Sequence, residues 1–344
     1  MAPKQLPTRP LGKNGPQVSA IGLGLMGLSI AYGEVENDEE RLKFLDYAHE
    51  QGETFWDSSD IYGDNEALIG KWFATRPGKR DDIFLATKFG IKVDPATYSM
   101  SADGTPEYVH SAFNASLSKL GVSSIDLYYV HRIDASTPIE HTVGAMAELV
   151  AAGKVKYLGL SECSADTLRR AYAVHPIACV QVEYSPFALD IEKPHVDLLR
   201  ACRELGVSVV CYSPLGRGIM TGQIKSRDQF EPTDCRLFYP RFSEENFPKN
   251  LELVEKVNEI AVKKGITPGQ ATLAWILAQG IDFIPLPGTK KAKYLQENID
   301  AINVQLTPEE VAKIREYCEN CEPAGERAAA MMNNMDYGDS APLK

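Results

Sequence analysis

The chain has 344 residues, of which 44% are hydrophobic, enough to bury the core of one barrel-sized domain or of two ordinary domains. Its formal net charge of −11 argues against a nucleic-acid or anionic-membrane partner, because a negative field repels phosphate groups. Seven cysteines, an odd number without a dense framework, are typical of reduced thiols in the cytoplasm.

Three further patterns narrow the class of protein. The first ten residues lack the hydrophobic region of a signal peptide, and the longest apolar stretch, 271–281, is too short to span a membrane. Cys318 and Cys321 form a CxxC motif without a second ligand pair nearby, so we expect no metal site. We therefore expect a soluble, cytoplasmic protein, and no pattern indicates its oligomeric state.

Short β-branched or apolar runs alternate with longer helical patterns from residue 18 onward, which is typical of βαβ units and a parallel sheet. Eight such runs occur, the number that a closed (β/α)8 TIM barrel requires. The predicted strands are Val18–Leu23, Thr54–Trp56, Ile83–Ala86, Leu127–Val130, Val155–Leu160, Ala178–Val182, Val207–Cys211 and Phe283–Leu286.

Amphipathic helices are predicted between these runs, and several end on a glycine of the kind that terminates helices in a left-handed conformation. These glycines are Gly52, Gly121, Gly153 and Gly206. The helical stretches are 38–51, 106–120, 139–152, 166–174, 193–205 and 308–321.

No linker or composition shift divides the chain, so we predict one barrel domain over residues 8–323 and a C-terminal tail over 324–344. The segment Ser213–Phe247 after the seventh strand is too long for an ordinary loop, and loops of this length are usually functional.

Three glycines after the first strand, Gly22, Gly24 and Gly27, spell GxGxxG, so a two-domain Rossmann dehydrogenase is an alternative. That motif must open a helix that receives a pyrophosphate, yet no strong helix start occurs before Asn37. The favoured interpretation is that these glycines let the backbone lie close beneath a flat ring at the barrel mouth, with Met26 touching the cofactor or substrate.

Four ionisable residues follow consecutive predicted strands: Asp57 and Tyr62 after the second, Lys88 after the third and His131 after the fourth. In a barrel the carboxyl ends of the strands share one face, where active sites lie. Each residue alone is explained by an ordinary structural role, but their joint placement favours catalysis.

This set suits the reduction of a carbonyl. Tyr62 would protonate the oxygen, and Lys88 would lower the pKa of its phenol, held in place by Asp57. His131 would donate a hydrogen bond that polarises the carbonyl.

The segments 57–63, 87–88, 129–132 and 159–161 resemble signatures of the aldo-keto reductase family, in particular its pyridoxal reductase and perakine reductase-like branch. The resemblance covers nearly the whole chain. It implies a barrel fold, NADPH (NADP+) as cofactor and a small-molecule carbonyl as substrate. It also implies that Asp57, Tyr62, Lys88 and His131 form the catalytic tetrad, with Tyr62 as general acid.

The resemblance extends to cofactor-binding segments. It implies that Tyr212 stacks on the nicotinamide, that Ser161, Glu162 and Gln181 hold the carboxamide, and that the segment after Ser213 follows the pyrophosphate. The cofactor-binding positions so assigned are Gly24, Met26, Asp57, Ser161, Glu162, Gln181, Tyr212, Ser213, Pro214, Leu215, Gly216, Arg217, Gly218, Pro287, Gly288, Thr289, Lys290, Lys293, Glu297 and Asn298.

Lys290, Lys291 and Lys293 fall in the first turns of a helix predicted to start after Gly288. Cations there oppose the helix dipole, so they make more sense facing an anion such as the 2′-phosphate of NADPH, although a solvated charge run is the alternative. By the resemblance, Glu297 and Asn298 contact the adenine.

Glu162 departs from the resemblance, since most relatives have Asn there. A carboxylate accepts from the carboxamide NH2 but cannot serve its carbonyl oxygen, which leaves this contact open.

An alternative function is a nucleotide-sensing regulatory subunit of the same fold with slow turnover, for which the tail, with Met331, Met332 and Met335, is the candidate interaction segment. Substrate choice would depend on the loops 89–105, 131–137 and 213–247. Aromatic residues there predict an apolar pocket: Phe89, Tyr98, Phe238, Tyr239 and Phe242.

Overall fold

A central sheet of eight parallel strands dominates the computed structural model, which describes residues 3–94, 96–97, 99–328 and 335–343. The strand order is β12-β11-β10-β9-β8-β5-β4-β3. The strands are β3 (Leu23–Gly24), β4 (Phe55–Asp57), β5 (Phe84–Phe89), β8 (Ile125–Val130), β9 (Val155–Ser161), β10 (Cys179–Glu183), β11 (Ser208–Tyr212) and β12 (Phe283–Leu286).

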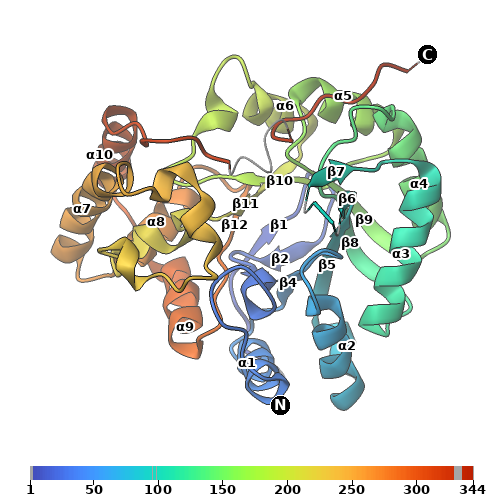
Figure 1. Ribbon diagram of the computed structural model, residues 1–344, viewed down its shortest axis with the longest axis horizontal. Helices are drawn as coiled ribbons and strands as arrows, with labels where there is room; N and C mark the ends of the chain where they lie inside the picture. Colours follow the sequence, from blue (N-terminus) through green and yellow to red (C-terminus); the bar gives the residue numbers. More distant parts are fainter. Residues whose placement is uncertain (1–2, 95, 98, 329–334, 344) are drawn as a thin grey trace.

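The first and last strands of this order meet, so the sheet closes. The Gly22 amide donates to the Pro285 carbonyl at 2.9 Å, the Gly24 amide donates to the Pro287 carbonyl at 3.2 Å, and Gly24 pairs with Gly288. Figure 1 looks at the sheet with helices around it. The predicted (β/α)8 barrel is confirmed.

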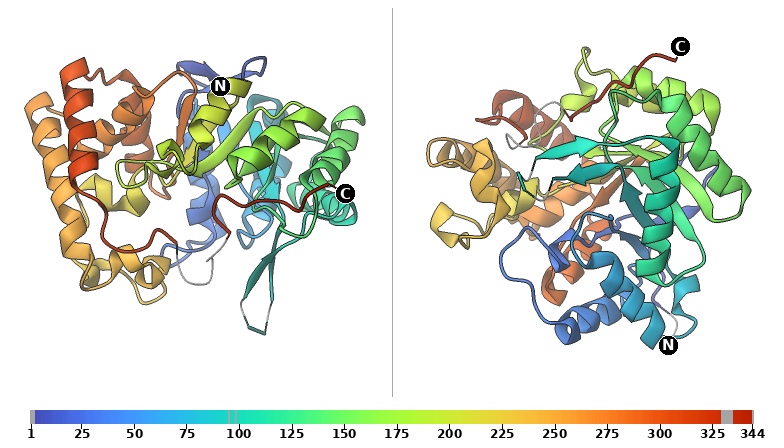
Figure 2. Two further views of the ribbon diagram at one scale, coloured as in Figure 1. Left: turned by 90° about the horizontal axis from the view of Figure 1, so that it is seen from above. Right: turned by 45° about the vertical axis from the view of Figure 1, so that its right-hand side comes forward.

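Helices surround the barrel in Figures 1 and 2. Among the described residues there are ten α-helices, with eight short 3-10 helices in the connections. The α-helices are α1 (Asp38–Glu50), α2 (Asn65–Thr75), α3 (Pro106–Leu120), α4 (Ile139–Ala151), α5 (Ala165–Val174), α6 (Leu198–Leu205), α7 (Phe247–Lys264), α8 (Pro268–Leu277), α9 (Ala292–Asp300) and α10 (Pro308–Asn320). The 3-10 helices are η1 (Met26–Leu28), η2 (Lys79–Asp82), η3 (Asp190–Glu192), η4 (Gly216–Thr221), η5 (Arg227–Gln229), η6 (Cys235–Phe238), η7 (Pro240–Phe242) and η8 (Ala301–Asn303).

The predicted glycine terminators are confirmed. Gly52, Gly121, Gly153 and Gly206 have φ angles of 88°, 62°, 69° and 70°, in the left-handed region that a residue with a Cβ adopts only at a cost.

The structure differs from the sequence prediction in three places. The predicted strand Val18–Leu23 is split, because β2 (Gln17–Ser19) pairs with β1 (Thr8–Pro10) in an antiparallel hairpin and only Leu23 and Gly24 join the barrel. The helix predicted over residues 193–205 begins at Leu198. A second hairpin, β6 (Ile91–Val93) with β7 (Met100–Ala102), projects from the barrel in the left view of Figure 2.

The GxGxxG glycines close the barrel instead of opening a Rossmann helix. Gly22 and Gly24 precede the three-residue η1, which contains Gly27. A Cβ on Gly22 would lie 2.8 Å from the Leu286 side chain and 2.9 Å from that of Phe55, and one on Gly24 would lie 3.3 Å from the Leu286 carbonyl oxygen. The close approach of β3 and β12 therefore leaves little room for a side chain at either glycine.

The last described segment, residues 335–343, lies against the rim of the barrel, as the dark red end of the ribbon in Figure 1 shows. Gly338 exchanges backbone hydrogen bonds with Glu162 and Ser164 at 2.8 and 3.0 Å. The Ser340 hydroxyl accepts from the Ile139 amide at 3.2 Å, and Arg170 donates to the Ala341 carbonyl at 2.7 Å. Within the described part of the chain, no helix is long and apolar enough to cross a membrane.

Gly159, inside the barrel on β9, provides a test of how tightly the interior is packed. A Cβ there would lie 2.5 Å from the Tyr129 ring and 3.3 Å from the Cys179 carbonyl oxygen, so we predict that Gly159→Ala lowers the free energy of unfolding by about 1–3 kcal/mol. The measurement is urea denaturation.

The matched control is Gly144→Ala on α4, where a Cβ would meet nothing within 4 Å. Removing a helix-interior glycine there should raise the free energy of unfolding by about 0.5–1 kcal/mol. Equal stability of the two variants would contradict the assigned packing.

Candidate active site

The carboxyl ends of neighbouring strands bring a buried ammonium, a carboxylate and a phenol together. Asp57 ends β4, Lys88 lies near the end of β5, and Tyr62 follows β4 in a turn. The Lys88 ammonium, 0% exposed, pairs with Asp57, donates to the Ser58 carbonyl at 2.7 Å, and lies 3.4 Å from the Tyr62 hydroxyl. Gln181 on β10 donates to the other Asp57 oxygen at 2.9 Å.

Burial and charge act in opposite directions on this pair. Burial alone would lower the pKa of Lys88, but Asp57 and Tyr62 raise it above the ordinary value. Burial raises the pKa of Asp57, and Lys88 and Gln181 counteract this only in part. The lysine is therefore a stable cation although its side chain is fully buried.

The net effect on Tyr62 is opposite to that expected from the sequence. Burial raises the pKa of the phenol, and this outweighs the lowering by the neighbouring Lys88. Tyr62 therefore stays protonated at physiological pH, the form that can donate a proton to an oxygen.

His131 joins this group from the loop after β8, with its ring edge-on to Tyr62 at 5.8 Å between ring centroids. Its Nδ1 lies 3.0 Å from the Ser59 hydroxyl, which lies 3.2 Å from an Asp60 carboxylate oxygen. Burial, with Lys88 and Arg132 nearby, lowers the pKa of His131 well below its usual range, so the ring is neutral. Burial and Glu66 raise the pKa of Asp60 to about 7.

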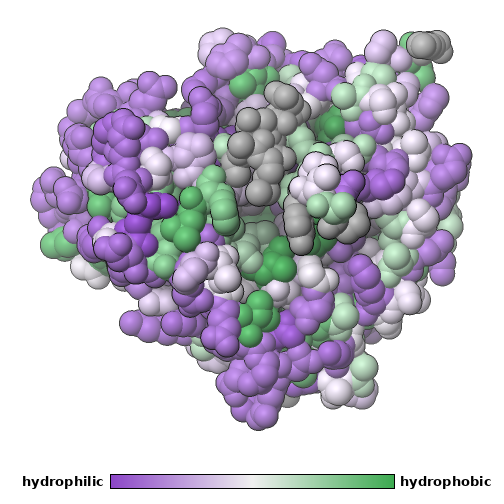
Figure 3. All heavy atoms as spheres, in the orientation of Figure 1, coloured by the Kyte–Doolittle hydropathy of each residue, from purple (hydrophilic) through white to green (hydrophobic). Residues whose placement is uncertain are grey.

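A cavity of about 600 Å³ opens beside this group. Figure 3 shows hydrophobic side chains around a hollow near the centre of the face of the molecule that it draws. Most residues assigned from the sequence border it. They are Gly24, Met26, Asp57, Tyr62, His131, Ser161, Gln181, Tyr212, Ser213, Pro214, Leu215, Arg217, Gly218, Pro287, Gly288, Thr289, Lys290, Glu297 and Asn298. Lys88, Glu162, Gly216 and Lys293 are not among the residues that line it.

The segment after β11 runs along the cavity in an unusual backbone conformation. Ser213 and Arg217 have φ angles of 47° and 55°, which residues other than glycine rarely adopt, and Gly218 has a φ of 93°. Arg217 donates to both oxygens of the Glu183 carboxylate, at 2.7 and 3.0 Å, and lies over the Tyr239 ring. The ion pair fixes this strained turn against β10.

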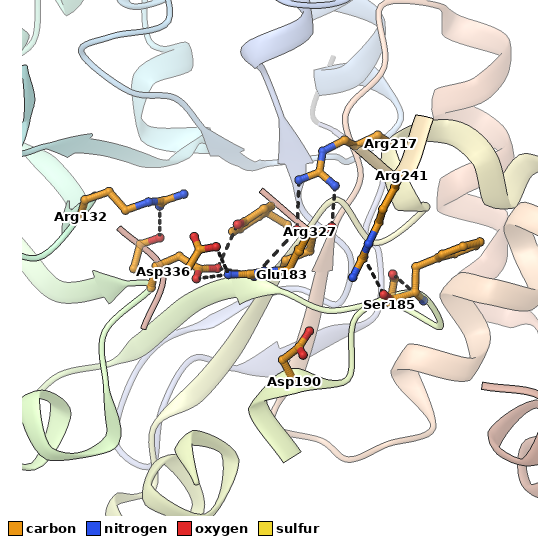
Figure 4. Close-up of polar contacts among 12 residues, drawn as sticks. Arg132, Glu183, Ser185, Asp190, Arg217, Arg241, Arg327 and Asp336 are labelled. Carbon is orange, nitrogen blue, oxygen red and sulfur yellow. Dashed lines mark hydrogen bonds and ion pairs between the residues drawn. The ribbon is translucent and has the colours of Figure 1, made fainter. Parts of the chain in front are cut away.

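Glu162 is held by a partner that the sequence did not indicate. Arg327, in the C-terminal segment, donates to both Glu162 oxygens at 3.1 and 2.8 Å, and the Tyr212 hydroxyl donates to one of them at 2.9 Å (Figure 4 shows Arg327 in this group). Burial opposes ionisation of Glu162, but Arg327 outweighs it and lowers the pKa to about 2. Arg327 also pairs with Asp336 at 2.8 Å.

The lysines near β12 are arranged differently from the prediction. Helix α9 begins at Ala292, so of the three lysines only Lys293 lies in its first turn. The Lys290 ammonium donates to the Tyr32 and Glu34 carbonyls at 3.1 and 2.7 Å, and Lys291 also lines the cavity.

The aromatic residues of the loops divide into two groups. Phe238 and Tyr239 line the cavity, as expected. Phe89 is 0% exposed and stacks on Tyr128, while Phe242 packs against other phenylalanines, so their expected place in the pocket is wrong. Tyr98, Met331 and Met332 lie outside the described residues.

Comparisons with known proteins agree with this architecture. The profile of the Aldo/keto reductase family matches residues 20–319. The chain is 58% identical to Aldo-keto reductase str7 of Strobilurus tenacellus, over 95% of this chain and 96% of that protein. It is 50% identical to Aldo-keto reductase yakc [NADP(+)] of Schizosaccharomyces pombe, over 98% and 99%.

Solved structures give the same result. A thermostable aldo-keto reductase, crystallised with the inhibitor epalrestat, is 28% identical with a TM-score of 0.72, over 91% of this chain and 100% of that one. A glycerol dehydrogenase from Gluconobacter oxydans is 25% identical with a TM-score of 0.81, over 94% and 98%. The chain belongs to the aldo-keto reductase family, a family of oxidoreductases.

Proposed function

We propose that this protein reduces an aldehyde or ketone to an alcohol with NADPH as the hydride donor. The observation that carries the proposal is the buried Lys88 ammonium, joined to Asp57 and to the Tyr62 hydroxyl at the edge of a 600 Å³ cavity. Burying a lysine completely is costly, and a site that does so beside a protonated phenol is suited to donating a proton. The NADP(+) in the name of the S. pombe relative supports the choice of cofactor.

The residues present suit a dinucleotide. Tyr212 borders the cavity with an aromatic ring that a nicotinamide can stack on, and Gly218 lets backbone amides approach phosphate oxygens. Ser161 and Gln181 offer a hydroxyl and an amide for the carboxamide. Glu162 is committed to Arg327 and Tyr212, so in our proposal it positions these groups.

When bound, NADPH supplies the hydride that reduces the carbonyl carbon. Tyr62 donates its phenolic proton to the carbonyl oxygen, and Lys88 stabilises the phenolate that remains. Asp57 fixes the ammonium, while Gln181 fixes Asp57. His131, neutral at physiological pH, donates a hydrogen bond from Nε2 to the same oxygen.

The proton on His131 Nε2 depends on the hydrogen bonds at Nδ1. Nε2 carries the proton when the Ser59 hydroxyl donates to Nδ1. Ionised Asp60 competes for the single Ser59 proton, whereas protonated Asp60 donates to Ser59 and leaves that proton for His131. Protonation of Asp60 therefore favours the tautomer that polarises the substrate.

Fluorescence titration with NADPH, followed by loss of nicotinamide absorbance against a panel of carbonyls, tests the proposed function. We expect Tyr62→Phe to bind NADPH normally but to reduce carbonyls about 10²- to 10⁴-fold more slowly, because it lacks the general acid. Unchanged turnover would contradict the mechanism. Binding by the wild-type protein without turnover on any carbonyl would favour the regulatory alternative.

The pH dependence of reduction provides a second prediction. The pKa of Asp60 is raised to about 7, so the residue is protonated below this pH and ionised above it. Reduction should therefore slow as the pH rises through about 7. Asp60→Asn, which cannot ionise, should remove this step and keep the activity of the low-pH form.

Ser59→Ala is the matched comparison, because it removes the partner of Nδ1 at every pH and should slow reduction throughout. ¹⁵N NMR of the His131 ring reports which nitrogen carries the proton, independently of turnover. An unchanged pH profile in Asp60→Asn would rule out the role of Asp60.

The choice between NADPH and NADH provides a third prediction. Lys290→Ala with Lys293→Ala should weaken NADPH binding at least about ten-fold and change NADH binding much less, because only NADPH carries the 2′-phosphate. Lys313→Ala with Lys249→Ala, whose lysines pair with Glu316 on α10 and Glu245 near α7, is the charge-matched control. Equal weakening for both nucleotides would remove the phosphate assignment.

A further inference from the structure

Buried arginines gather at one side of the cavity, and most of their charge is neutralised within the group. Figure 4 shows Arg327 beside Asp336 and Arg217 beside Glu183. Arg327 also pairs with Glu162, and these guanidiniums each donate two hydrogen bonds to one carboxylate. Both are satisfied as buried charges must be.

Arg132 is different. It is 5% exposed, yet Nη1 donates only to the His131 carbonyl at 2.9 Å and to the Ser161 hydroxyl at 3.4 Å. Its Nε has no hydrogen-bond partner. Within the described residues, Nη2 makes no hydrogen bond, and no carboxylate lies within 4.0 Å of the Arg132 guanidinium. The buried Nε has left water without a replacement acceptor, which is costly. Burial alone would lower the pKa of Arg132, but Tyr212, Glu162 and Asp336 raise it above the ordinary value.

The unused donors have a defined geometry. Nε and Nη2 lie on one edge of the planar guanidinium, and this edge binds both oxygens of a carboxylate side by side. Arg132 borders the cavity, so a ligand there can reach it. An acceptor with two oxygens fits this edge.

The local charge points the same way. The cluster contains four guanidiniums, Arg132, Arg217, Arg241 and Arg327, and three carboxylates, Glu162, Glu183 and Asp336. Burial and Glu162 raise the pKa of Asp336, and Arg327 and Arg132 counteract this in part. Asp190 lies nearby but pairs with Lys193. A positive excess persists in a chain of net charge −11, and an anionic ligand would neutralise it.

The position of Arg132 distinguishes this anion from the phosphates of the cofactor. Arg132 follows β8 directly after His131, whereas the segment proposed to bind the pyrophosphate follows β11. Two strands, β9 and β10, separate them in the sheet. An anion bound at Arg132 therefore lies on the His131 side of the cavity, where the carbonyl is proposed to react.

We infer that Arg132 recognises a carboxylate of the substrate, so that the preferred substrates are oxo acids, in which an aldehyde or ketone and a carboxylate are parts of one small molecule. This inference rests on the proposed reductase function and specifies its substrate class. Arg132 is a specificity-determining residue, distinct from the groups that move the proton.

Two matched substrate pairs test the inference: 4-oxobutanoate with its methyl ester, and 3-carboxybenzaldehyde with its methyl ester. In the wild-type protein the acids should have the higher kcat/KM. Arg132→Met should lower kcat/KM for the acids about 10- to 100-fold, the range expected for a lost charge-assisted hydrogen-bonded pair, and change it less than about three-fold for the esters. Arg132→Lys keeps the positive charge but loses the planar guanidinium. Its kcat/KM for the acids should lie between those of the wild-type protein and Arg132→Met.

Arg241→Met is the matched control. Arg241 donates to the Phe187 carbonyl at 2.8 Å, belongs to the same cluster and is not among the residues that line the cavity. We expect this variant to keep the ratio of acid to ester kcat/KM. A general loss of packing would instead lower both values in both variants.

Two binding measurements keep the test independent of turnover. Calorimetric titration with benzoate, which cannot be reduced, should give binding to the wild-type protein that Arg132→Met loses, while fluorescence titration gives the same affinity for NADPH in both. Benzoate binding that survives in Arg132→Met, equal losses for acids and esters, or weakened NADPH binding in this variant would each overturn the inference. Turnover of the esters without preference for the acids would overturn it and leave the reductase function intact.

Discussion

The buried ion pair between Lys88 and Asp57 is the constraint on which the rest of this site depends. An ammonium that is 0% exposed is stable only with its carboxylate and a full set of acceptors, here Asp57, the Ser58 carbonyl and the Tyr62 hydroxyl. These groups come from two neighbouring strands, so the pair forms only when β4 and β5 have their correct register in the closed barrel. The fold thereby determines the protonation states of the site.

A second set of buried ion pairs connects the barrel rim to the C-terminal segment. Arg327 binds Glu162 directly after β9, and Arg217 binds Glu183 at the end of β10. Breaking such a pair leaves a buried charge without compensation, which typically costs about 3–5 kcal/mol. The segment that carries Arg327 is therefore part of the proposed cofactor site, and the strained turn after β11 is held by the same network.

The sequence predicts the strands, and the convergence of Asp57, Lys88 and His131 at one rim, for one physical reason. In a parallel barrel the carboxyl end of every strand lies at the same rim, so the positions of Asp57, Lys88 and His131 after their strands place them together without knowledge of packing. Glycine terminators such as Gly121 are equally local, since only the backbone conformation of one residue is involved. Periodicity and local conformation are properties of short segments.

What the sequence does not predict depends on contacts between distant segments. Arg327 and Glu162 are 165 positions apart, and nothing local marks Arg327 as the partner. The one signal was the glutamate itself, because a carboxylate at a buried rim position requires a cation. The direction of the pKa shift of Tyr62 and the packing of Phe89 against Tyr128 likewise depend on burial. Burial emerges only when the helices and loops cover the barrel.

The binding of anionic ligands that we propose is compatible with the acidic character of the whole chain. A net charge of −11 repels anions at long range, but salt screens this field within about 8–10 Å. Inside the cavity the dielectric constant is low, so the attraction of an anion is decided by nearby groups. Among the described residues, Arg132 has no carboxylate within ion-pair distance. Selectivity for an anion can therefore reside in one side chain, while Arg217 and Arg327 are neutralised by their carboxylates and hold the rim together.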